Sequence, residues 1–138
     1  MWSFEFQHPT SAEPQALWAL WSDVAAWPQW DVDLEAVTLE GDFAVGTHGS
    51  LQPKGMDPFP FTITRAEPGR GYTDETPLPG AVLRFEQDLL EGEEGRVIRQ
   101  RVTMEGPAAN EWFEQIGGKI VLDVPAALAR LADRAEQA

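Results

Sequence analysis

The chain has 138 residues, of which 43% are hydrophobic, so its length and composition predict one folded domain over residues 1–138. Ten basic against 23 acidic residues give a net charge of −13, which repels phosphate backbones and excludes nucleic acid as a partner. The absence of cysteine excludes disulfides and thiolate chemistry. Because the sequence has neither a leader-like N-terminus nor a run of about 18 apolar residues, we expect a cytoplasmic protein without a membrane span.

The N-terminal third is predicted to form a strand and a helix. Residues 2–8 alternate apolar and polar side chains, which indicates a strand with one buried face, and Pro9 is expected to end it. Ser11 is a candidate N-cap for a helix whose apolar residues follow at helical spacing. The residue before a proline avoids helical geometry, so we expect the helix to break before Pro28 and residues 27–31 to form a tight turn.

The central part of the sequence is predicted to be an antiparallel meander. Strand-like segments are separated by clusters of glycine, proline and acidic residues that favour turns. These segments are residues 37–39, 46–51, 59–65, 72–76, 81–90 and 96–104.

A long helix is expected to close the chain. From residue 113 to residue 135, apolar side chains recur at spacings of three and four. Gly117, Gly118 and Pro125 interrupt this pattern, so we expect the helix to bend or weaken there. The two glycines either make room for a ligand against bare backbone or simply break the helix.

The last two strands can be aligned by their loop. A four-residue loop at 92–95 sets Glu91 opposite Arg96, and the resulting register places Gln87 opposite Gln100 on the buried face. The register pairs apolar residues on that face and opposite charges on the other: Leu89 with Ile98, Phe85 with Val102, Leu83 with Met104, Asp88 with Arg99 and Glu86 with Arg101. Buried amides need partners. Gln87 and Gln100 therefore bond to each other in a solid core, line a cavity that holds water or a ligand, or indicate a wrong register.

The order of elements resembles the helix-grip fold of the START and birch-pollen-allergen (SRPBCC) superfamily, and in particular its bacterial polyketide cyclase/dehydrase-like branch. The resemblance rests on Trp-Pro-Gln-Trp-Asp at 27–31, Gly-Thr-His-Gly at 46–49, Leu-Pro-Gly-Ala at 78–81, Gly-Pro at 106–107 and the helix end at 125–132. It implies an α+β fold in which a curved antiparallel sheet of six to seven strands wraps around the long C-terminal helix. Members of the superfamily bind lipids, sterols, polyketides or plant hormones in a pocket between sheet and helix, and some catalyse aromatic ring closure or dehydration.

Few residues are candidates for chemistry. His8 shares the inward parity of the first strand and is a weak candidate for a general acid or base, although a half-solvated histidine at a strand end is the simpler interpretation. His48 is expected to face outward. Asp74 and Glu75 are adjacent on a strand and point to opposite faces, so they do not form a carboxylate pair. No cofactor fingerprint or metal-ligand spacing is present, and we expect neither a cofactor nor a metal.

The leading prediction is a pocket that binds a small hydrophobic or amphipathic molecule, with Gln87, Gln100 and His8 as polar anchors. Its predicted walls are Phe61, Ile63, Leu83, Phe85, Val102, Trp112, Ile116 and Ile120. Trp27 and Trp30 form either an aromatic gate over the pocket mouth or a cap on the core. The alternatives are an aromatase/cyclase- or dehydratase-type enzyme and a ligand-free interaction module whose pocket has collapsed.

Overall fold

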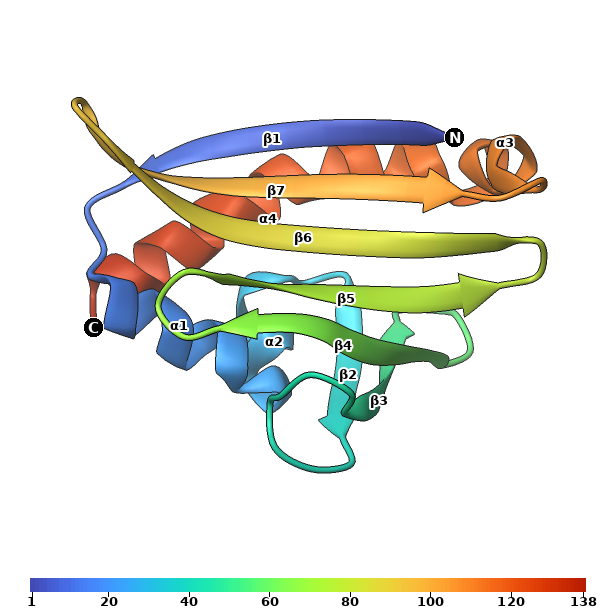
Figure 1. The fold of residues 1–138 in the computed structure, drawn as a ribbon, viewed down its shortest axis with the longest axis horizontal. Helices are drawn as coiled ribbons and strands as arrows, with labels where there is room; N and C mark the ends of the chain where they lie inside the picture. Colours follow the sequence, from blue (N-terminus) through green and yellow to red (C-terminus); the bar gives the residue numbers. More distant parts are fainter.

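Seven antiparallel strands form one sheet, in the order β1-β7-β6-β5-β4-β3-β2, in the computed structural model of residues 1–138 (Figure 1). The N-terminal strand lies beside the last one, and the other strands follow one another as the predicted meander. Their bounds are β1 Trp2–Thr10, β2 Leu34–Leu39, β3 His48–Pro53, β4 Phe59–Glu67, β5 Gly71–Leu78, β6 Ala81–Gly92 and β7 Gly95–Glu105.

The predicted register of the β6–β7 hairpin is confirmed. Glu91 lies opposite Arg96, and Gln87 lies opposite Gln100. Gly92 and Gly95 also pair, so the hairpin tip is only two residues long. Gly95 adopts a positive φ of 112°, a conformation that glycine reaches without the strain a side chain would bring.

The first strand and the first helix differ from the prediction at their junction. β1 continues through Pro9 to Thr10, because β1 is an edge strand and a proline there need not donate to a neighbour. Ser11 is not the N-cap: α1 (Pro14–Ser22) begins after Glu13. The Ser11 backbone N–H donates instead to the carboxylate of Glu136 (3.2 Å), which also accepts from the Thr10 hydroxyl (2.7 Å).

The helical segment that follows ends earlier than predicted. α1 ends at Ser22, and a short 3-10 helix, η1 (Val24–Ala26), leads into a single turn, α2 (Trp27–Trp30). The expected break directly before Pro28 is therefore wrong, since Pro28 lies in the first turn of α2, where its missing N–H has no intrahelical partner to lose.

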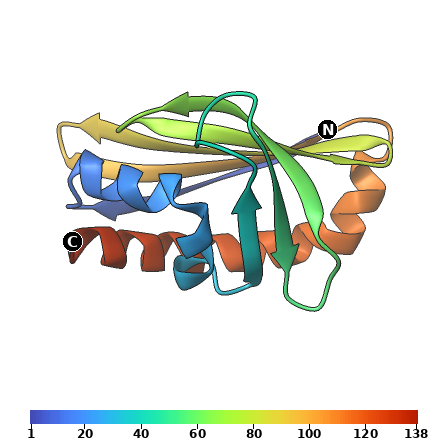
Figure 2. The same cartoon turned by 90° about the horizontal axis from the view of Figure 1, so that it is seen from below.

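The C-terminal helical region consists of α3 (Ala109–Trp112), a π-helical turn η2 (Phe113–Gly117) and α4 (Gly118–Glu136). Figure 2 shows that the segment before α4 turns away from the axis of α4. The interruption predicted at the glycines is confirmed there, whereas α4 continues without a break through Pro125.

The sheet curves around α4, which produces the predicted helix-grip fold. In Figure 2, α4 lies below the sheet, and β2 and β3 bend down toward it. Register shifts in the β2–β3 and β4–β5 ladders contribute to this curvature. Leu17 and Trp21 of α1 and Leu128 and Leu131 of α4 are almost fully buried in the core. No helix is long and apolar enough to cross a membrane.

Candidate functional site

A cavity of about 190 Å³ lies between the inner face of the sheet and α4. Because a cavity of about 150 Å³ can hold benzene, this space suits a ligand of one or two rings. Most of its walls are apolar. Its lining residues are Trp27, Trp30, Asp31, Asp33, Leu34, Leu51, Pro53, Met56, Phe59, Tyr72, Asp74, Thr76, Leu78, Leu83, Phe85, Gln87, Gln100, Ile116, Lys119, Ile120, Asp123, Val124 and Ala127.

Aromatic rings form one wall of the cavity. The Trp27 ring stacks on Tyr72, with which it lines the cavity, and on the buried ring of Phe61; the ring centroids are 5.6 Å and 6.0 Å away. Its indole N–H donates to the backbone carbonyl of Trp21 (2.9 Å), which fixes the ring. Trp27 and Trp30 are both buried, so they form part of the core wall rather than an exposed gate.

The two facing glutamines are not bonded to each other. The side-chain carbonyl of Gln87 accepts a hydrogen bond from the indole N–H of Trp21 (3.1 Å). The Gln100 side chain makes no hydrogen bond within the protein, although the residue is buried, and both glutamines line the cavity. The self-bonded pair is therefore not found, and the alternative of a cavity beside the glutamines agrees with the structure.

Asp74 and Thr76 of β5 are the most deeply placed polar residues without partners. Each is 3% exposed, and the Asp74 Oδ1 and Thr76 Oγ1 atoms are buried without a hydrogen bond. Burial, with a smaller contribution from the charge of Glu75, raises the pKa of Asp74 to about 7. Asp74 can therefore exist in either protonation state near neutral pH.

Three further carboxyl groups line the cavity beside α2 and α4. Burial raises the pKa of Asp31 to about 6, and the charges of Asp33 and Asp123 add to this effect. The pKa of Asp123 is raised by partial burial and by the neighbouring carboxyl group of Asp33. Lys119 is the one basic residue that lines the cavity.

The predicted wall residues separate into two groups. Eight line the cavity: Trp27, Trp30, Leu83, Phe85, Gln87, Gln100, Ile116 and Ile120. The other four, Phe61, Ile63, Val102 and Trp112, do not. Phe61, Ile63 and Val102 are at most 1% exposed and are covered by core side chains. Trp112 donates its indole N–H to the carbonyl of Pro79 (2.9 Å), outside the cavity.

Neither His8 nor the glycine pair contributes to the cavity. His8 pairs with Ile98 near the end of the edge strand and does not line the space. Gly117 is buried, and a side chain there would collide with the ring of Phe113, so this glycine accommodates a neighbouring residue rather than a ligand. Gly118 faces open space. His48 is exposed, as predicted, and contacts the Thr62 hydroxyl (2.8 Å).

Sequence reasoning missed Asp74 and Thr76, although a signal for them exists. Asp74 pairs with Phe85 and Thr76 pairs with Leu83. Extending the register of the last hairpin by one strand would have placed both on the inner face. Glu75 lies on the outer face, where it pairs with Arg84 (3.3 Å), so the prediction that the two carboxylates diverge is correct.

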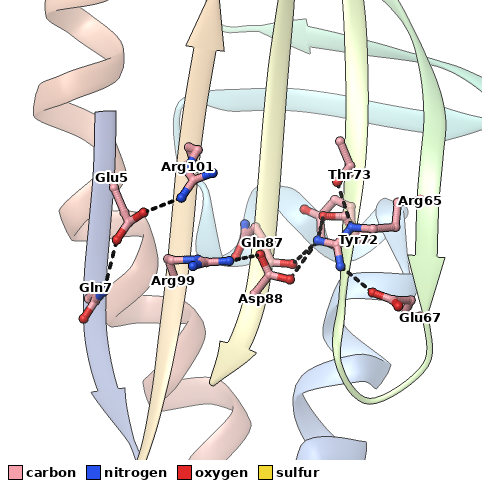
Figure 3. A network of polar contacts seen from close by, with 10 residues as sticks. All are labelled: Glu5, Gln7, Arg65, Glu67, Tyr72, Thr73, Gln87, Asp88, Arg99 and Arg101. Atoms are coloured by element: carbon pink, nitrogen blue, oxygen red, sulfur yellow. Dashed lines mark hydrogen bonds and ion pairs between the residues drawn. The ribbon is translucent and has the colours of Figure 1, made fainter. Parts of the chain in front are cut away.

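A polar network on the outer face holds the strands behind the cavity together (Figure 3). Asp88 accepts from Arg65 (2.8 Å) and from Arg99 (3.1 Å), and so links β4, β6 and β7. Arg65 also donates to the backbone carbonyls of Tyr72 (3.2 Å) and Gln87 (3.3 Å). The strands that carry Tyr72 and Gln87 into the cavity are thereby fixed from behind.

One protein family and several solved structures resemble this chain. The family described as polyketide cyclase / dehydrase and lipid transport matches residues 1–136. The Zhui aromatase/cyclase from Streptomyces sp. R1128 superposes with a TM-score of 0.76 at 13% identity, over 99% of this chain and 94% of that chain. No curated protein matches the chain at the level of sequence.

Other solved structures share the fold at similarly low identity. StfQ, a di-domain ARO/CYC from the steffimycin biosynthetic pathway, has a TM-score of 0.75 and 13% identity, over 98% of this chain and 50% of that one. Ara h 8.0201 has a TM-score of 0.67 and 16% identity, over 94% of this chain and 97% of that one. At these identities the superpositions establish a common fold and nothing finer.

Proposed function

Because the chain belongs to the polyketide cyclase / dehydrase and lipid transport family, as the sequence resemblance predicted, we propose that it binds a small hydrophobic or amphipathic molecule in the cavity between the sheet and α4. The observation that carries this proposal is the pairing of an apolar cavity with buried polar atoms that have no partner, Asp74 Oδ1 and Thr76 Oγ1. Apolar walls with a few convergent polar groups are typical of ligand sites.

The energetics support a ligand rather than a purely structural role. A buried polar group without a partner costs about 1–3 kcal/mol. The cost of two such groups, on neighbouring inward positions of β5, is a substantial fraction of the free energy of unfolding of a small domain, which is about 5–15 kcal/mol. A bound molecule that supplies hydrogen bonds to Asp74 and Thr76 removes this cost.

A second candidate function is proton transfer to a bound ligand, as in an aromatase/cyclase- or dehydratase-type enzyme. The observation that favours it is Asp74, a carboxyl group in a desolvated cavity with a pKa of about 7, because general acids and bases act best when their pKa lies near the working pH. Turnover of a bound polyketide-like compound that is lost in Asp74→Asn, while binding persists, would support it. A bound compound that is never converted counts against it.

A substitution that fills the cavity with a larger side chain tests the binding proposal. Ala127 is buried on α4 and lines the cavity, whereas its neighbour Ala126 is exposed. We expect Ala127→Phe to abolish binding of compounds that bind the wild-type protein, and Ala126→Phe to leave binding unchanged. Native mass spectrometry detects compounds that co-purify, and isothermal titration calorimetry with a panel of lipids and aromatic polyketide analogues measures affinity.

Thermal unfolding shows whether each variant is folded. If neither method detects a ligand in the wild-type protein, or if Ala127→Phe is folded and binds as the wild type does, the proposal is wrong. The first result favours the ligand-free interaction module.

A further inference from the structure

The cavity is lined by far more acidic than basic groups. It has four carboxyl groups, those of Asp31, Asp33, Asp74 and Asp123, and one ammonium group, that of Lys119. Lys119 is exposed, whereas Asp74 is buried, so the positive charge is the more hydrated of the two. A fatty acid or another anion would bring its charge toward groups of the same sign, which is unfavourable in a desolvated space.

Asp74 has no positive group of the protein to balance its charge. No arginine, lysine or histidine bonds to it, and the charged group that affects it most is Glu75, which has the same sign. Asp88 on the neighbouring strand is different, because two arginines hold it. A buried carboxyl group without a cation must bind a proton or a positive charge from elsewhere.

The surroundings of Asp74 suit an ammonium group. An ammonium group has three donors and no acceptor. Asp74 Oδ1, an acceptor, and Thr76 Oγ1, which can accept or donate, have no partners and lie on the same face of β5, and Gln100 lines the same cavity. Of the buried side-chain atoms without a partner on residues that line the cavity, only Trp30 Nε1 cannot accept a hydrogen bond from an ammonium group.

Aromatic and acidic groups extend this preference to the rest of the cavity. Trp27, Trp30 and Tyr72 line the cavity, and the faces of such rings attract cations. The carboxyl groups near α2 and α4 and the overall charge of −13 attract cations from solution. No group of three or more His, Asp or Glu side chains is placed to hold a metal ion.

From these observations we infer that the ligand is a small apolar amine, whose positively charged amino group binds to the carboxyl group of Asp74 and whose apolar body fills the space against Trp27 and α4. This inference rests on the proposed function and names its ligand class. It excludes fatty acids and other anionic lipids as ligands of this cavity.

Three probes with the same bicyclic body test the inference: 2-naphthylmethylamine, 2-naphthylmethanol and 2-naphthoate. Calorimetric titration at pH 7.5 is expected to show the amine binding about tenfold or more tightly than the alcohol, because hydrogen bonds to charged groups are the stronger ones. We expect no measurable binding of the carboxylate. Asp74→Asn keeps the size of the side chain but removes its charge, and should bind the amine and the alcohol equally.

Two controls separate the cavity from the acidic surface. Glu93→Gln removes one negative charge from the exposed hairpin tip and should keep the preference for the amine. Ala127→Phe should abolish amine binding, whereas amine attracted only to the surface would still bind.

The outcomes distinguish this inference from the proposed function. Equal or tighter binding of the alcohol or the carboxylate overturns the amine inference and leaves binding in the cavity intact. A preference for the amine that persists in Asp74→Asn or in Ala127→Phe also overturns it. If no probe binds and no other compound is found to bind the wild-type protein, both the inference and the proposed function are wrong.

Discussion

The indole N–H of Trp21 donates to the side-chain carbonyl of Gln87 at 3.1 Å, and both residues are at most 2% exposed. This bond joins α1 to the middle of β6 and leaves Gln100, opposite on β7, without a partner. The two glutamines therefore have different roles, although the sequence makes them look equivalent.

Replacing each glutamine with leucine should reveal this difference. Gln87→Leu leaves the buried Trp21 N–H without an acceptor and should lower the free energy of unfolding by about 1–3 kcal/mol. Gln100→Leu removes an amide that faces the cavity and makes no hydrogen bond to another side chain, so it should be neutral or stabilising. Urea unfolding of the two variants measures both effects. A coupling energy between Trp21→Phe and Gln87→Leu in a double-mutant cycle would confirm the bond, and equal losses in both leucine variants would contradict it.

Much of the architecture follows from the sequence, because local patterns and register rules determine it. The alternation along β6 and β7 and the short loop between them fix the pairing of Gln87 with Gln100. The end of β1 was predicted less well, because Thr10 and Ser11 are held by Glu136, a residue at the other end of the chain. No local signal reports such a contact.

The site was predictable only in part for a similar reason. Alternation identifies which residues face inward, but it does not separate those that face a cavity from those that face packed side chains. Phe61 and Val102 face inward and are covered, whereas Phe85 faces inward and lines the cavity. That difference depends on the curvature of the whole sheet and on the position of α4.

The raised pKa of Asp74 predicts an unusual pH dependence of stability. Since its value in the folded protein is about 7 and its ordinary value is 3.8, the folded state binds this proton more tightly between those values, and stability falls as the pH rises through that range. Asp31 has a raised pKa as well and acts in the same direction. Tyr72 and Glu75, the other titratable groups beside Asp74, are unchanged in the variant Asp74→Asn. Comparing this variant with the wild type therefore isolates the effect of Asp74.

Asp74→Asn should therefore be more stable than the wild type at pH 8, by an amount on the order of 4 kcal/mol at about 1.4 kcal/mol per pH unit. The difference should shrink to nearly zero at about pH 2.5, below both pKa values, where the wild-type carboxyl group is protonated in the folded and unfolded states alike. Urea unfolding at several pH values measures it. A difference that does not depend on pH would show that the carboxyl group is ordinary.

The outer network predicts a larger effect for one acidic residue than for another on the same strand. Asp88 is mostly buried between Arg65 and Arg99, whereas Glu91 is exposed and pairs with Arg96 alone through a contact of 3.1 Å between Arg96 Nε and Glu91 Oε1. Asp88→Asn should cost about 1–3 kcal/mol, because it weakens two partly buried charge-assisted bonds. Glu91→Gln should cost less than about 1 kcal/mol and little in high salt. Similar losses in the two variants at both low and high salt would contradict a special role for Asp88.

The glycine pair at the start of α4 provides a matched test of the π-helical turn. A Cβ atom at Gly117 would collide with the ring of Phe113, whose centroid lies 5.0 Å from that of Trp2, whereas a Cβ atom at Gly118 meets nothing within 4 Å. Gly117→Ala should therefore displace Phe113 and destabilise the protein by about 1–3 kcal/mol, as overpacking does. Gly118 has helical backbone geometry and open space around it. Gly118→Ala should therefore stabilise the protein by up to about 1 kcal/mol. Thermal unfolding measures both effects, and near-ultraviolet circular dichroism reports the displacement around Trp2. A harmless Gly117→Ala would mean that the π-helical turn does not depend on the absence of this side chain.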